Sequence, residues 1–353
     1  MTVSSGALAR ASEYNSVATL VNKVFGDNYS SSLPTDVDRT NHKFGWGAVN
    51  IDASVPVSEL ITADRLQYMV DRVNIMIDHC NITDTFLYFA APTASRVTVD
   101  KFTLIRAEDL NVVENKIINT ILSSNIHLSI DPTDASLFES EPTVPMLRST
   151  PWNNILTGEF KWVFDSYNHA RYFFNSGGQV RLSFDLSGGS TAGYYNWADV
   201  LNEIGILSMT YDNILQSSNN YSPGIREEKG FYDLTEYYGD GSDAGSPDEG
   251  LLFTSAGVSP GGYGYGSSGY SSYSSLRAKV YGKWANGGSE VHFKIILDDT
   301  AFDQVVDGTL LVIHNYLMPD IITRSSWAGT AEFDVTPDPY VVVIDNFNSG
   351  DDS

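Results

Sequence analysis

Residues 276–297 read LRAKVYGKWANGGSEVHFKIIL, and this stretch sets the fold of the second half of the chain. Apolar side chains alternate with charged or polar ones on each side of Gly287-Gly288, with the period of two that is typical of strands with one buried face. The two glycines allow a tight reversal of the chain. The stretch therefore predicts an antiparallel hairpin of two strands.

Four further runs with strand character lie on either side of the hairpin. Two of them alternate in polarity and two are mostly apolar, so together with the hairpin they predict antiparallel sheets packed as a sandwich. Between them, Asn168–Asn175 predicts a short helical turn, and Trp197–Ile204 predicts an amphipathic helix that ends at Gly205. The four runs are residues 160–164, 180–186, 310–317 and 340–347.

The first third of the chain repeats one helical pattern three times. Apolar residues spaced by 3, 4 and 4 positions form a narrow stripe on a helix face, as in a helical bundle or a short coiled coil. Ser12, Thr62 and Arg106 mark the helix starts, because acidic residues follow each of them. We predict that the stripes form an assembly interface, which consists of Tyr14, Val17, Val21, Phe25, Leu66, Met69, Val73, Ile77, Leu110, Val113, Ile117 and Ile121.

The connections between these helices are long and polar. Residues 26–56 carry Gly and Pro, residues 81–101 carry Pro92, and such long segments are typical of proteins that wrap around partners. The fold class that we predict is α+β, with a helical repeat region, mainly antiparallel β domains and a C-terminal β-sandwich. Its parts are a docking and oligomerisation region at 1–129, a linker at 130–151, an α+β domain at 152–254, an arm at 255–275 and a β-sandwich-like portion at 276–353 that packs with the preceding domain.

Two segments predict exposed loops. Residues 261–275 consist of Gly, Tyr and Ser alone, so they form either an adhesive contact loop or a plain surface loop. The acidic stretch at 240–249 either holds a structural cation or is a solvated loop, and its spacing is not that of an EF-hand. The candidate contact residues of the arm are Tyr263, Tyr265, Tyr270 and Tyr273.

The overall charge argues against two classes of partner. Lys and Arg number 21 against 44 Asp and Glu, which gives a formal charge of −23. Without a basic cluster, neither nucleic acid nor an anionic membrane surface is an expected partner. The chain has one cysteine, Cys80, so an intrachain disulfide is excluded. No apolar run or leader is evident in the sequence. We therefore expect that the chain is made in a cytoplasm and does not insert into a membrane.

Catalytic signatures are missing from the sequence. The histidines are far apart, and Asp78-His79-Cys80 is a run of neighbours that point in different directions on a helix. Neither a phosphate-binding loop nor a nucleophile elbow occurs. We predict no catalytic residues, no cofactor, no metal site and no enzymatic activity, although a pair of carboxylates brought together by folding stays an alternative. The histidines are His42, His79, His127, His169, His292 and His314.

Two stretches resemble a known group of proteins. The first runs from Ser4-Ser5-Gly6 through Ala11-Ser12-Glu13-Tyr14-Asn15 to Phe25-Gly26-Asp27 and resumes at Ile61-Thr62-Ala63-Asp64. The second joins Trp152-Asn153-Asn154-Ile155, Asn168-His169-Ala170-Arg171-Tyr172-Phe173-Phe174-Asn175-Ser176-Gly177-Gly178-Gln179-Val180-Arg181 and Trp197. Together they resemble the virion structural proteins, associated with tail, fibre or baseplate, of T4-like and marine cyanobacterial myophages. The resemblance implies a virion role without catalytic residues.

The motif at residues 168–181 predicts a structural corner. Asn175 can cap or turn the chain, and Gly177-Gly178 allows positive φ before the next strand. His169 and Arg171 are expected to bond to backbone or to a carboxylate.

Three functions follow from these observations as alternatives. The first is a structural subunit of a tailed-bacteriophage virion, in the tail, baseplate, neck or fibre attachment, which assembles in the host cytoplasm as a trimer or hexamer and docks on other virion proteins. The second is an adhesin that binds host-surface glycans through the tyrosine arm. The third is a polysaccharide depolymerase, for which no motif argues. We expect the first.

Overall fold

The computed structural model describes twelve stretches of the chain, namely residues 9–26, 45–47, 50–79, 107–118, 138–140, 145–217, 224–227, 229–238, 250–255, 276–300, 304–318 and 340–349. It divides into two compact units. The helical unit comprises Met1–Phe138, Arg171–Gly177 and Met318–Thr336. The sheet unit comprises Glu139–Ala170, Gly178–Leu317 and Pro337–Ser353.

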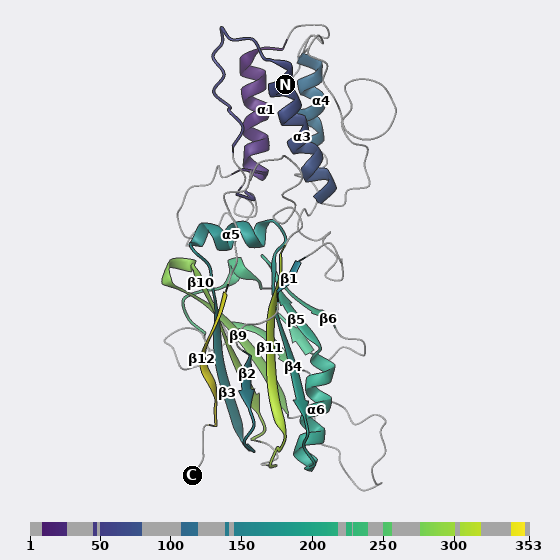
Figure 1. The fold of residues 1–353 in the computed structure, drawn as a ribbon, viewed down its shortest axis with the longest axis vertical. Coiled ribbons are helices and arrows are strands. Elements are labelled where there is room, and N and C mark those ends of the chain that lie inside the picture. Colours follow the sequence, from purple (N-terminus) through teal and green to yellow (C-terminus); the bar gives the residue numbers. More distant parts are fainter. Residues whose placement is uncertain are drawn as a thin grey trace. The chain divides into compact units, whose positions relative to one another are not determined.

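The described residues of the helical unit contain the helices α1 (Ala11–Val24), α3 (Ala63–His79) and α4 (Ala107–Lys116) (Figure 1). They lie where the repeated pattern predicts helices. Thr62 caps α3 as expected, because its hydroxyl accepts a hydrogen bond from the backbone N–H of Arg65 at 3.3 Å. Ser12 lies inside α1 and is not its cap; the Glu13 carboxylate accepts the backbone N–H of Arg10 at 2.8 Å instead. Arg106 lies outside the described residues.

The apolar stripes of the three helices pack into one core. Each described stripe residue exposes at most 2% of its surface, so the stripes are covered by their own chain. The prediction that they form an assembly interface is therefore wrong, because a stripe indicates that a face is covered and not which chain covers it. The buried members are Tyr14, Val17, Val21, Phe25, Leu66, Met69, Val73, Ile77, Leu110, Val113 and Ile117, while Ile121 lies outside the described residues.

Part of the first long connection lies along α1 in an extended conformation. Asn15 and Asn22 stand seven positions apart on the helix, and each uses its side-chain amide to donate and accept one backbone hydrogen bond. Asn22 pairs in this way with Ile51 at 2.8 and 2.7 Å, and Asn15 pairs with Val55 at 3.0 Å in both directions. The segment therefore lies along its own helix, and the backbone groups of Ile51 and Val55 are satisfied by side chains and not by a neighbouring strand.

The corner motif joins the helical unit through α5 (Tyr167–Asn175), whose last residues belong to that unit. The Asn175 side chain donates a hydrogen bond to the carbonyl oxygen of Gly45 at 3.1 Å. Gly47 has a φ of +79°, and a Cβ there would come within 2.5 Å of the Tyr172 ring, so glycine is required. Gly177 has a φ of +98°, as the corner predicts.

Two antiparallel sheets build the sheet unit (Figure 1). The first sheet has the order β1-β11-β4-β5-β6, with β2 also paired to β11. The second sheet has the order β12-β3-β10-β9-β8-β7. The first contains β1 (Phe138–Ser140), β2 (Met146–Arg148), β4 (Gln179–Ser187), β5 (Ile206–Met209), β6 (Ile214–Ser217) and β11 (Thr309–Met318). The second contains β3 (Ile155–Val163), β7 (Gly224–Arg226), β8 (Leu251–Ser255), β9 (Arg277–Ala285), β10 (Glu290–Asp298) and β12 (Tyr340–Ser349).

The predicted hairpin is β9 and β10, paired from Glu290 opposite Ala285 to Asp298 opposite Arg277. Its turn holds three consecutive residues at positive φ, Asn286, Gly287 and Gly288, which explains the glycine pair. β10 also pairs with β3, and β11 pairs with β4. Strands from residues 152–254 and from 276–353 are thus interleaved in both sheets, and do not form the two separate parts that the sequence predicts.

Facing residues of the two sheets contact each other through aromatic rings. The His314 ring on β11 stacks on Phe160 of β3 at 4.7 Å between centroids, and Phe160 stacks on Phe293 of β10 at 5.1 Å. The segment around η2 (Phe231–Asp233) bridges the two sheets at one side. The backbone N–H of Phe231 donates to the carbonyl oxygen of Thr210 after β5, and the carbonyl oxygen of Thr235 accepts the backbone N–H of Trp284 on β9.

Candidate functional site

A polar network covers the face of the second sheet that points away from the first sheet. Phe160 and Phe293 point between the sheets, so Glu159, Lys161 and His292 point to the opposite face by the period of two. Register places Lys161 of β3 opposite His292 of β10. The strand pairing thus gathers side chains that are more than 130 positions apart in the sequence.

His292 bridges two carboxylates in this network. Its Nδ1 lies 3.3 Å from an oxygen of Glu159, and its Nε2 lies 2.9 Å from an oxygen of Glu290. The Lys161 Nζ lies 2.9 Å from the same Glu290 oxygen. The Tyr238 hydroxyl hydrogen-bonds to Glu159 at 2.5 Å, so the chain after η2 is tied to β3 across two intervening strands.

The two carboxylates have lowered pKa values. Burial alone would raise the pKa of Glu159, but hydrogen bonds from His292 and Tyr238 and the charge of Lys283 outweigh it. Burial would likewise raise the pKa of Glu290, and its hydrogen bonds with His292 and Lys161 outweigh that effect. Both groups are therefore held in the charged form that their partners need.

Histidine beside carboxylates is a pattern that general acid–base catalysis uses. Here each carboxylate already has two partners, and Tyr238, which exposes 3% of its surface, lies under Lys283 with 4.2 Å between its ring centroid and Nζ. The geometry suits a brace that holds three strands and the segment after η2 together. We interpret the network as the means by which this sheet face is fixed.

A second polar cluster fixes the start of α6 (Ala192–Ile204). The Asp307 carboxylate accepts the backbone N–H groups of Ser190 and Thr191 and both of their hydroxyls, at 2.7–3.0 Å. The hydrogen bond from the Thr191 backbone is the largest cause that holds the Asp307 pKa well below its usual range. Thr191 in turn caps α6 by accepting the N–H of Tyr194 at 3.1 Å. This cluster anchors the chain before β11 to α6.

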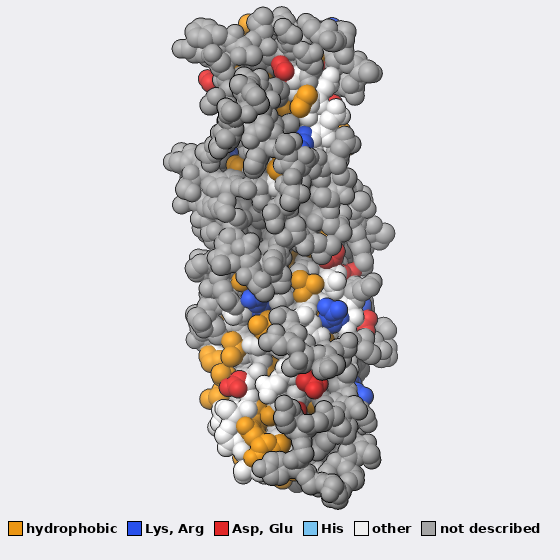
Figure 2. All heavy atoms as spheres, turned by 90° about the vertical axis from the view of Figure 1, so that its right-hand side faces the viewer, with side chains coloured by type: hydrophobic (Ala, Val, Ile, Leu, Met, Phe, Trp, Pro, Cys, Tyr) orange, Lys and Arg blue, Asp and Glu red, His pale blue; other side chains and the backbone are white. Residues whose placement is uncertain are grey.

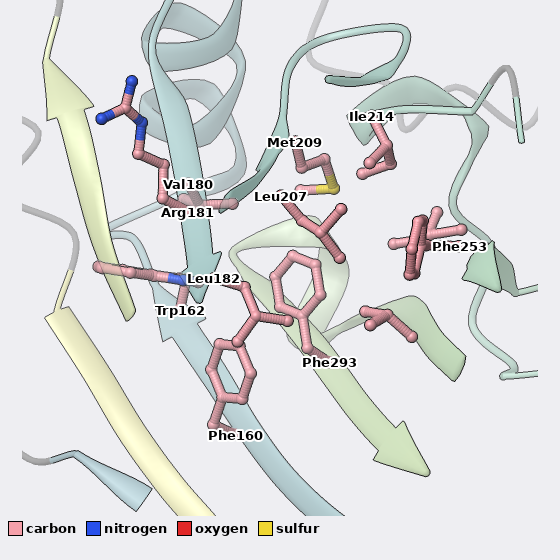
Figure 3. A pocket seen from close by; sticks show the side chains of 12 residues that line it. Phe160, Trp162, Val180, Arg181, Leu182, Leu207, Met209, Ile214, Phe253 and Phe293 are labelled. Carbon is pink, nitrogen blue, oxygen red and sulfur yellow. The ribbon is translucent and has the colours of Figure 1, made fainter. Parts of the chain in front are cut away.

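A small apolar cavity lies between the sheets. Its free space is about 10 Å³, enough for roughly one water molecule. Figure 3 shows Phe160, Phe293, Leu207 and Met209 directed toward it. It is lined by Phe160, Trp162, Val180, Arg181, Leu182, Leu207, Met209, Ile214, Leu252, Phe253, Val280 and Phe293. A space of this size is a packing defect of the core, too small for an organic ligand.

Large apolar side chains reach the surface of both units. In the helical unit, Val57 and Leu60 stand on the turn before α3 and expose 92% and 83% of their surface. Figure 2 shows the side of the sheet unit that carries α6, where hydrophobic side chains reach the surface in several groups. The other exposed members are Tyr68, Val112, Ile118, Leu147, Ile155, Tyr195, Tyr237, Val305, Tyr340, Val342 and Ile344.

The structure places three of the six histidines in defined surroundings. His292 belongs to the network, and His314 is buried on the inner face of β11. His169 Nδ1 lies 3.5 Å from the Asp165 carboxylate, close enough for an ion pair but without the hydrogen bond that was expected. Arg171 is buried over the Tyr172 ring, 4.9 Å from its centroid. Among the described residues, no group of three His, Cys, Asp or Glu is placed to hold a metal ion.

Other predicted residues lie outside the described part of the chain. These are the tyrosine arm with Tyr263, Tyr265, Tyr270 and Tyr273, the acidic stretch at 240–249, Cys80, His42 and His127. No described helix has the length and apolar character that crossing a membrane requires. Searches against protein-family models, curated proteins and solved structures found no match to this chain.

Proposed function

We propose that this chain is a structural subunit of a tailed-bacteriophage virion, part of the tail, baseplate, neck or fibre attachment. It acts by assembling with copies of itself, as a trimer or hexamer, and by docking on other virion proteins. The fold that goes with this role is a bundle of repeated helices joined to a β-sandwich. The residues at 152–155, 168–181 and 197 support the assignment by their resemblance to myophage structural proteins.

One observation carries the assembly part of this proposal. The described polar clusters brace the fold, as at His292 and Asp307, while large apolar side chains stay exposed on both units. Single exposed apolar side chains are ordinary, but groups of them such as Tyr340, Val342 and Ile344 on one strand are typical of surfaces that meet another protein. The formal charge of −23 keeps the chain soluble before it assembles with its partners.

The direct test is the composition of the particle. We expect mass spectrometry of virions from a phage that encodes this chain to find its peptides at a fixed copy number after washing with salt and nuclease. A density map of the intact particle would then give its position and symmetry. The chain found free in the lysate but missing from washed particles would contradict the proposal.

A further inference from the structure

β12 is an edge strand whose first half has no partner on one side among the described strands. It ends the strand order of the second sheet and pairs with β3 alone (Figure 1). An edge strand presents a row of backbone N–H and C=O groups that can pair with another chain. The first half of β12 can therefore pair with a further strand.

An apolar stripe runs along this half of β12. Tyr340 and Val342 share one face of the strand by its period of two, and Ile344 is also exposed at the bulge between Val343 and Asp345. They expose 55%, 36% and 46% of their surface. From Tyr340 to Ile344 the strand rises by four residues, so the stripe is about 13 Å long. It stands next to the free edge, where a further strand would cover it.

The second half of β12 is protected in ways that the first half is not. Register shifts interrupt its pairing with β3 after Val343 and after Asp345, and Phe347 has a positive φ of 50°. The Arg148 guanidinium of β2 donates a hydrogen bond to the carbonyl oxygen of Phe347 at 2.9 Å. Bulges and covering side chains are the devices by which proteins block their sheet edges. The residues from Tyr340 to Val343 pair with β3 in regular register.

Charge restricts the occupant of this edge. The whole chain carries −23, so most faces of two copies repel each other. Residues 340–344 contain no charged side chain, and the β3 residue opposite Val342 is Lys161. Within this stretch, two copies can meet through uncharged side chains alone.

The stripe is also complementary to the same stripe of a second copy. In an antiparallel pair centred on Val342, Val342 lies opposite its copy and Tyr340 lies opposite Ile344. All three exposed apolar residues of one copy then meet those of the other on one face, as favourable cross-strand pairs. The two six-stranded sheets would form one continuous sheet across the contact.

We propose that two copies of this chain pair through residues 340–344 of β12, antiparallel and centred on Val342. The inference rests on the proposed self-assembly and specifies its contact. A two-fold contact is compatible with a hexamer made of three such pairs, whereas a simple three-fold ring lacks two-fold axes.

Cysteine cross-linking tests both the contact and its register. All variants carry Cys80→Ser, so that each has a single cysteine. Opposite residues of an antiparallel pair have Cα atoms about 4.5–5.5 Å apart, within the range of a disulfide. We expect Val342→Cys to form a disulfide-linked dimer on mild oxidation. Tyr340→Cys and Ile344→Cys should cross-link when mixed, with at least about five times the yield that either gives alone.

The control is Val57→Cys, which exposes a cysteine at an apolar position of the helical unit and reports random collisions. A second variant, Val342→Lys, should halve the mass of the assembly in native mass spectrometry while its circular dichroism stays unchanged. Cross-linking of Val342→Cys no higher than that of Val57→Cys, or equal yields for every combination, would overturn the proposal. Virion incorporation is measured separately, so a chain present in particles with no Val342 cross-link removes this contact and leaves the proposed function standing.

Discussion

The helical unit and the sheet unit differ in how they cover their apolar side chains. The stripes of α1, α3 and α4 expose at most 2% of each described residue. The stripe of β12 exposes between 36% and 55%. The helical stripes are visible in the sequence as apolar residues at spacings of 3 and 4, whereas residues 340–344 are apolar at every position, so the sequence does not show which of their side chains stay exposed.

The two units also use polar side chains differently. In the helical unit, Asn15 and Asn22 satisfy the backbone of an extended segment that has no strand partner. In the sheet unit, the backbone is satisfied by neighbouring strands, and polar side chains such as His292 and Glu159 link one strand to the next. Removal of a polar group should therefore cost more in the helical unit, where it leaves backbone groups buried and unpaired.

The largest expected effect comes from placing the same charge in each stripe. Val73→Lys buries an unpaired charge in the helical core and should destabilise the helical unit by about 4 kcal/mol or more. Val342→Lys places that charge at an exposed edge and should change stability by less than about 0.5 kcal/mol. Urea denaturation at low protein concentration measures both. Equal losses would show that the two stripes are covered alike.

Next in size is the loss of an asparagine bridge. Asn22→Ala leaves the buried N–H and C=O of Ile51 without their partner and should cost about 2–4 kcal/mol. Asn15→Ala is the matched control, because its bridge to Val55 is only partly buried and should cost about half as much. Hydrogen exchange of the Ile51 amide should become faster in the first variant alone.

A smaller effect is expected from acid. The pKa values of Glu159 and Glu290 are lowered by folding, so their contribution is present above the ordinary carboxyl pKa of 4.5 and is lost as pH falls through the lowered values. Glu159→Gln should cost about 1 kcal/mol at pH 7 and should reduce the loss of stability between pH 5 and pH 3. Unfolding followed by tryptophan fluorescence across this range would show it, and an unchanged pH profile would contradict the role of the network.

The smallest effect is expected at Asp307, which is half-buried. Asp307→Asn weakens the hydrogen bonds to Ser190 and Thr191, so the first turn of α6 should open more readily while the global stability hardly changes. Hydrogen exchange of the Tyr194 amide measures this local opening. Because folding lowers the Asp307 pKa, the wild-type contribution is fully present above the ordinary pKa and is lost as pH falls through the lowered value.

Local patterns predicted the elements better than their partners. The helix that begins at Ala63 and the hairpin around Gly287 depend on the spacing of apolar residues within short segments, which the sequence displays directly. The pairing of β3 with β12 joins residues about 180 positions apart, and its register depends on the packing of both faces. For this reason the interleaving of the two sheets was not predicted.

The polar network was missed for the same reason. His292 and Lys161 stand on the polar sides of two strands that the sequence analysis identified, and the missing information was the register that makes them opposite. The exposed side chains of β12 could not be predicted in the same way, because residues 340–344 are apolar at every position and their exposure depends on the position of the strand at the edge of the sheet.

The mass of the full-length chain in solution is the measurement that tests self-assembly most directly. Native mass spectrometry or sedimentation at tens of micromolar should find an even number of copies, and Val342→Lys should reduce that number by half. A single copy in both proteins at these concentrations would contradict the account, since the apolar edge of β12 would then be stable in water without a partner.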